Sequence, residues 1–192
     1  NVTGDGYTVF DDDTKIYNGR TNGYAVATPN ITTGFKYNKN HVNQIKGGDI
    51  KADGSLILKL YYDREQYNVV FIDGEDEHEQ LVRYQADAIA PELVKEGYTL
   101  SWDIDFTKII SDKAVNSIWT INQYKIVYNT DSGVKPVDIT YNYADKVNLP
   151  ILQFDDYSFK GWFTDASFNT PFTGVKQNRG ALIHGHHGIV FV

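Results

Sequence analysis

The sequence has no cysteine and no methionine among its 192 residues. Without cysteine the chain cannot form a disulfide framework, a cysteine-based zinc site or a thiol nucleophile. The missing initiator methionine indicates that the chain is a segment of a longer protein. The chain also has no secretory leader and no run of about 18 apolar residues, which a membrane-spanning helix requires. Targeting and anchoring signals can lie outside such a segment, so their absence here excludes nothing.

A surplus of positive charge is missing as well. The chain has 18 lysine and arginine residues against 25 aspartate and glutamate residues, a net charge of −7. The acidic excess lies entirely in residues 67–123, whereas residues 1–66 and 124–192 are balanced. An acidic chain without a basic stripe does not attract a phosphate backbone or an anionic membrane surface. We therefore expect no nucleic-acid partner and no membrane contact by this segment, which we also expect to be a monomer.

What the chain does have is a repeated strand opening. An aromatic and β-branched stretch occurs at residues 7–10, 67–71 and 124–128, each time beginning with tyrosine. A period near sixty residues is the size of one small folded unit, and internal repeats set the architecture. We therefore predict three units in series, at residues 1–66, 67–123 and 124–192.

The composition within each unit favours β-structure. Tyrosine and phenylalanine, with 14 and 10 copies, suit half-buried strands. Apolar and polar residues alternate along residues 137–143, as is typical of a strand with one buried face. One helical turn is expected at Glu92–Glu96, so the predicted class is mainly β, or α+β at most. The other expected strands are residues 15–17, 24–27, 49–51, 56–62, 69–72, 81–84, 98–102, 114–121, 157–163 and 181–192.

The junctions between the predicted units are short. Residues 63–66 and 120–123 contain no run of glycine, proline or serine that would make a loose tether. We therefore expect closely coupled units in an elongated tandem arrangement.

Two tryptophans occupy corresponding places in the second and third units. Trp102 follows Pro91 by eleven positions, and Trp162 follows Pro150 by twelve. We predict that both rings fill the core of their unit, and that each indole N–H has a hydrogen-bond partner.

Several ordered motifs resemble known repeat families. The second unit contains Val82-Arg83-Tyr84 and Lys95-Glu96-Gly97-Tyr98, and the third contains Phe159-Lys160-Gly161-Trp162-Phe163 followed by Thr170-Pro171-Phe172. These motifs resemble the internalin-type B repeat, or Listeria–Bacteroides repeat, of bacterial surface proteins. The first unit, with Gly54-Ser55-Leu56 and Leu60-Tyr61-Tyr62-Asp63-Arg64, is similar to the mucin-binding-protein-type repeats of Gram-positive cell-wall proteins.

The resemblance implies small β-grasp-like modules strung along a secreted protein attached to the cell wall. Such modules act as stalks, spacers or adhesive units, and the family has no catalytic residues to carry over. The third unit departs from the pattern at its end. Residues 183–188 read Ile-His-Gly-His-His-Gly in place of the usual apolar strand, which puts the last strand in doubt.

That histidine cluster is one candidate site. His184, His186 and His187 could together bind a transition metal. The alternative is an irregular strand or tail with exposed histidines. We favour the alternative because Gly185 and Gly188 give no fixed geometry and no nearby carboxylate completes a ligand set.

Acidic clusters are the other candidates. Asp11–Asp13 and Glu75–Glu79 lack the alternating ligands of a calcium loop, so we interpret them as solvated hairpin tips. Asp103 with Asp105, and Asp155 with Asp156, lie near aromatic residues in the manner of a glycosidase pair. Caps and turns explain these carboxylates more simply. We therefore predict no catalytic, cofactor-binding or metal-binding residue, no cofactor and no enzymatic activity.

These observations favour a non-enzymatic extracellular repeat segment on a bacterial cell surface, acting as a stalk, spacer or adhesive module. One alternative is an adhesin region that itself binds a host glycan or protein. Another is an accessory region of a secreted hydrolase. A large exposed aromatic patch would favour the adhesin over the spacer.

Overall fold

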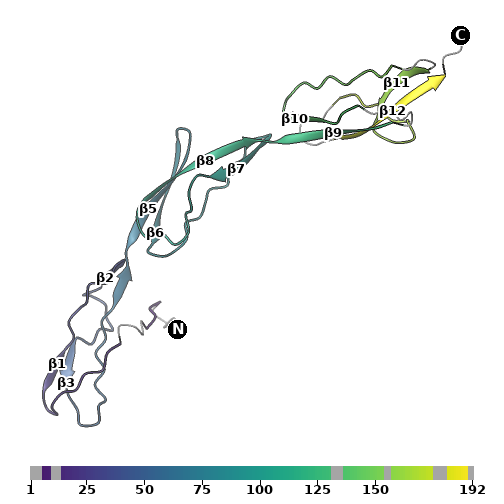
Figure 1. Ribbon diagram of the computed structural model, residues 1–192. Coiled ribbons are helices and arrows are strands. Elements are labelled where there is room, and N and C mark those ends of the chain that lie inside the picture. Colours follow the sequence, from purple (N-terminus) through teal and green to yellow (C-terminus); the bar gives the residue numbers. More distant parts are fainter. Residues whose placement is uncertain (1–5, 10–13, 131–135, 154–156, 175–180, 190–192) are drawn as a thin grey trace. The chain divides into compact units, whose positions relative to one another are not determined.

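The computed structural model describes residues 6–9, 14–130, 136–153, 157–174 and 181–189. These residues form twelve strands and no helix, so the predicted mainly β class is confirmed (Figure 1). The helical turn expected at Glu92–Glu96 is wrong, because this stretch is irregular between Pro91 and Gly97. Five residues are too few for a stable helix without a buried face, and Val94 is exposed.

The chain divides into two compact units, residues 1–90 with 104–115 and residues 91–103 with 116–192. Strands β5 and β9 begin at Gln66 and Gln123, close to the predicted boundaries, which themselves remain a prediction. The strands are β1 Tyr24–Val26, β2 Phe35–Tyr37, β3 Gly47–Asp49, β4 Tyr62–Arg64, β5 Gln66–Asp73, β6 Asp76–Arg83, β7 Tyr98–Trp102, β8 Lys113–Ile121, β9 Gln123–Thr130, β10 Ile139–Asn142, β11 Tyr157–Phe163 and β12 Ala181–Ile189.

Regular structure is sparse before β5. Strand β1 pairs with β3, and β2 with β4, as two sheets of two short antiparallel strands. The strands expected at residues 15–17 and 56–62 are wrong, apart from a bridge at Lys59 and the start of β4. Residues 7–9 contain only a bridge at Thr8, and Phe10 lies outside the described residues. Tertiary packing does not support these patterns, since Ile16, Ile31 and Val42 remain exposed.

Two four-stranded sheets share one strand order. The order is β6-β5-β8-β7 in the first and β10-β9-β12-β11 in the second, so corresponding strands occupy corresponding places (Figure 1). In the second sheet β12 runs parallel to β9 and antiparallel to β11. The histidine- and glycine-rich segment therefore lies in a regular strand, and the doubt about this last strand is resolved.

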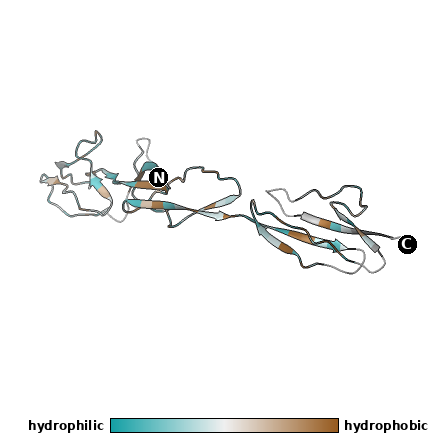
Figure 2. Ribbon diagram, turned by 90° about the horizontal axis from the view of Figure 1, so that it is seen from above, coloured by the Kyte–Doolittle hydropathy of each residue, from teal (hydrophilic) through white to brown (hydrophobic). Residues whose placement is uncertain are grey.

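Alternating burial explains why these strands form. In the middle of β5 and β9 every second side chain is fully buried, although β5 has four consecutive apolar residues, and apolar stretches mark the strands in Figure 2. The fully buried side chains are Val69, Phe71, Ile109, Val115, Ile126, Tyr128 and Ile183. None of them comes from the described residues before β5.

The two tryptophans differ in burial. Trp162 is only 6% exposed, and its indole N–H donates to the Pro150 carbonyl at 2.8 Å, as predicted. Trp102 lies on the corresponding strand but is only half-buried, so the prediction that both rings fill the core is wrong for Trp102. In its sheet the loop after β7 supplies the core instead, with Phe106 packed edge-on against Phe71 at 5.2 Å and Ile109 fully buried.

Candidate functional site

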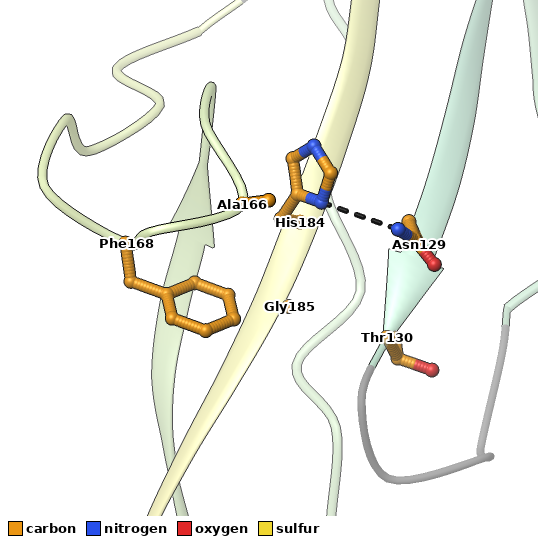
Figure 3. Close-up of a pocket in the computed structure, with 6 residues that line it drawn as sticks. All are labelled: Asn129, Thr130, Ala166, Phe168, His184 and Gly185. Atoms are coloured by element: carbon orange, nitrogen blue, oxygen red, sulfur yellow. Dashed lines mark hydrogen bonds between the residues drawn. The ribbon is translucent and has the colours of Figure 1, made fainter.

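A small cavity lies where β9 and β12 meet the loop after β11 (Figure 3). Its volume is about 270 Å³, slightly below the range typical of small-molecule sites. The lining is mixed, with one aromatic ring, one imidazole, an amide and a hydroxyl. The six lining residues are Asn129, Thr130, Ala166, Phe168, His184 and Gly185.

The strands position the polar side of this cavity. His184 on β12 pairs with Asn129 on β9 in the parallel register. Their side chains meet at 3.3 Å between the histidine Nδ1 and the asparagine Nδ2 (Figure 3). Because the amide nitrogen can only donate, this contact requires an imidazole whose Nδ1 accepts. Gly185 follows on the same strand, and an added Cβ there would lie 2.9 Å from the Trp162 ring.

Asp165 shapes the aromatic side of the cavity. Its carboxylate accepts hydrogen bonds from the backbone N–H groups of Ser167, Asn169 and Thr170 at 3.0, 3.2 and 2.8 Å. These bonds, that from Asn169 first, lower the pKa of Asp165 below its ordinary value. The turn holds Phe168 at a φ of 58°, where its ring packs edge-on against Phe163 at 5.6 Å.

The side chains that line the cavity are those of a binding site. Among the residues that line it, His184 carries the one ionisable side chain, and no lining residue is a carboxylate or a lysine. Acid–base chemistry needs two groups with different proton affinities facing one reacting bond. A ring face beside donors and acceptors instead fits a ligand with apolar and hydroxylated surfaces.

The predicted histidine cluster is only partly described. His184 lines the cavity, whereas the side chains of His186 and His187 lie outside the described part of the chain. Across the residues that the structure does describe, no group of three or more potential ligands could hold a metal ion. The expectation of no metal therefore stays a prediction.

The acidic run of the second unit is a strand and not a hairpin tip. Only Gly74 and Glu75 form the turn, and β6 begins at Asp76. Neighbouring strand residues point to opposite faces, so successive carboxylates of this run do not converge on one ion. The other predicted run, Asp11–Asp13, lies outside the described residues.

The described aspartate pair, Asp103 and Asp105, forms hydrogen bonds that support the local structure after β7. Asp103 accepts hydrogen bonds from the Asn116 backbone N–H and side-chain amide at 2.7 and 2.8 Å. Asp105 accepts from the Thr107 backbone N–H and hydroxyl, both at 2.9 Å, and the backbone bond is the first cause of its lowered pKa. The other predicted pair, Asp155 and Asp156, lies outside the described residues.

An aromatic cluster near β4 was not predicted from the sequence. The His41 ring stacks on Tyr61 at 3.6 Å with an 11° angle between their planes. Tyr7 meets both rings edge-on, and its hydroxyl donates to the Asp63 carboxylate. These residues are far apart in the sequence and follow no period, so no local pattern indicates that they meet.

Comparisons with known proteins support the resemblance for one part of the chain. The family model of the Listeria-Bacteroides repeat domain matches residues 124–180, which confirms this resemblance for the third unit. A Gly-rich membrane protein of Evansella cellulosilytica is 25% identical over 68 residues, which is 35% of this chain. The aligned part is 8% of that relative's length. In the described part of this chain, no helix is long and apolar enough to cross a membrane.

Proposed function

We propose that the chain is a non-enzymatic, extracellular repeat segment of a bacterial surface protein, which acts as a stalk or spacer. The observation that carries this proposal is the match of residues 124–180 to the Listeria-Bacteroides repeat domain. The four-stranded sheet before it has the same strand order, which supports a second copy of the same module. The described turns use their aspartates for backbone hydrogen bonds, which fits a structural role.

Three finer points belong to the same proposal. The modules are β-grasp-like repeats in tandem, and the first is of the mucin-binding-protein type. The segment is a monomer attached to a Gram-positive cell wall through sequence outside it, and it binds neither nucleic acid nor the membrane. The relative described as a membrane protein favours a surface location, and the complete gene would show any leader and sorting signal.

Small-angle scattering tests the spacer. A compact chain of 192 residues has a radius of gyration of about 16 Å by length scaling. We expect a clearly larger value, because the connections between the predicted units are short. Glu65 is the single residue between β4 and β5, and Asn122 is the single residue between β8 and β9. Neither connection is a long linker through which neighbouring units could fold back on one another. A value near the compact one would contradict the spacer.

The cavity favours a second candidate, an adhesin region that binds a host glycan. A sugar offers hydroxyl groups for Asn129 and His184 and an apolar face for Phe168, and all three line the cavity. We expect weak saccharide binding seen as shifts of the Phe168 and His184 NMR signals, lost in Phe168→Ala. Exposed Tyr17→Ala is the matched control. Unshifted signals across a panel of saccharides would reject this candidate.

A further inference from the structure

Each compact unit contains a tyrosine ring that lies directly on a glycine. A Cβ added to Gly34 would lie 2.3 Å from Cγ of Tyr84, and one added to Gly97 would lie 2.1 Å from Cγ of Tyr143. A real Cβ cannot approach a ring carbon so closely. The two glycines also share a left-handed backbone, with φ of 76° and 79°, which favours glycine independently of the ring.

The backbone around the two contacts follows one pattern. Glu65, the single residue between β4 and β5, donates its N–H to the Gly34 carbonyl and accepts from the Tyr84 N–H, at 2.8 and 2.7 Å. Asn122, the single residue between β8 and β9, has the same two bonds with Gly97 and Tyr143, both 2.8 Å. Each connecting residue therefore has its N–H and its C=O bonded, which opposes rotation of its peptide groups.

The two tyrosines lie in equivalent turns. Tyr84 and Tyr143 directly follow β6 and β10, and the next residues, Gln85 and Ala144, have φ of 59° and 65°. Other groups reinforce each ring. Phe35 packs edge-on against Tyr84 at 5.7 Å. Burial, and then a hydrogen bond to Glu96, raises the pKa of Tyr143.

We propose that these sites are one device used twice, a glycine–tyrosine clamp that holds a one-residue strand connection and prevents it from acting as a hinge. The N-terminal clamp consists of Gly34, Glu65 and Tyr84, and the C-terminal clamp of Gly97, Asn122 and Tyr143. The ring covers the glycine and shields the hydrogen bonds of the connecting residue from water. In the N-terminal clamp the glycine directly precedes β2 and the tyrosine directly follows β6, and in the C-terminal clamp the glycine directly precedes β7 and the tyrosine directly follows β10.

Amide hydrogen exchange on the full chain tests the clamp, with each copy as the control for the other. In Tyr143→Leu we expect the Asn122 and Tyr143 amides to exchange at least about tenfold faster, because local opening no longer has to displace a ring. The Glu65 and Tyr84 amides should stay within about twofold of the parent chain, which is the spread expected for a distant site. In Tyr84→Leu, the Glu65 and Tyr84 amides should exchange faster, and the Asn122 and Tyr143 amides should stay close to the parent chain. Tyr143→Phe keeps an aromatic ring and should keep the slow exchange of the Asn122 and Tyr143 amides.

Two results would overturn the clamp. One is unchanged exchange at the connecting residue when its tyrosine is replaced. The other is equal acceleration at core amides such as Ile126, which would make the tyrosine an ordinary part of the core. The role of the clamp in preventing a hinge rests on the proposed spacer function. The experiments can nevertheless reject the spacer function and the clamp independently of each other. A compact scattering radius with locally lost protection would reject the spacer and leave the clamp standing.

Discussion

Replacing Trp162 with alanine should unfold the sheet of β9 to β12. The ring packs with Tyr128 at 4.7 Å and Phe159 at 5.3 Å in a cluster that also contains Ile126, Tyr141 and Ile183. Removing a buried tryptophan costs about 3–5 kcal/mol of unfolding free energy, and it would leave the Pro150 carbonyl without its indole donor. A module of this size has little more stability than that. Urea unfolding followed by circular dichroism measures the loss.

Trp102→Ala is the matched control, since Trp102 lies on β7, which corresponds to β11. Its ring is half-buried, so less apolar surface returns to water when it is removed. We expect Trp102→Ala to cost clearly less than Trp162→Ala. An equal or greater loss from Trp102→Ala would contradict this explanation, which attributes the difference to burial.

A fragment of residues 1–65 should not fold by itself, whereas residues 66–192 should. The described part of 1–65 contains no fully buried apolar side chain, and Ile16, Ile31 and Val42 are 95%, 105% and 90% exposed. Backbone ordering costs about 1–2 kcal/mol per residue, and without a core little offsets it. Residues 66–192 keep all seven of the fully buried side chains named above.

Circular dichroism and proton–nitrogen NMR spectra test whether each of the two fragments folds. We expect narrow amide dispersion from residues 1–65 and a dispersed β spectrum from residues 66–192. A cooperative thermal transition of the shorter fragment would show that the aromatic contacts of His41, Tyr61 and Tyr7 suffice to fold it. Loss of structure in the longer fragment would show that its sheets depend on the preceding residues.

The candidate site could be predicted only in part. The sequence drew attention to His184 as a candidate metal ligand, which we did not favour, and not as part of a cavity with Asn129 and Phe168. Those partners come from different strands and a loop, which a parallel pairing of β12 with β9 brings together. Such a pairing depends on the whole sheet, so residue spacing does not reveal it.

The sequence by itself determined the features that depend on neighbouring residues. The strands at Tyr98–Trp102 and Tyr157–Phe163 have the predicted bounds, because alternation and flanking turn residues act locally. Only the tertiary structure decided the rest. Trp162 is buried whereas Trp102, at a corresponding place in the sequence, is only half-buried, and this difference depends on how each sheet packs. Gly34 meets Tyr84, and Gly97 meets Tyr143, because hydrogen bonds of the strand connections bring distant residues together.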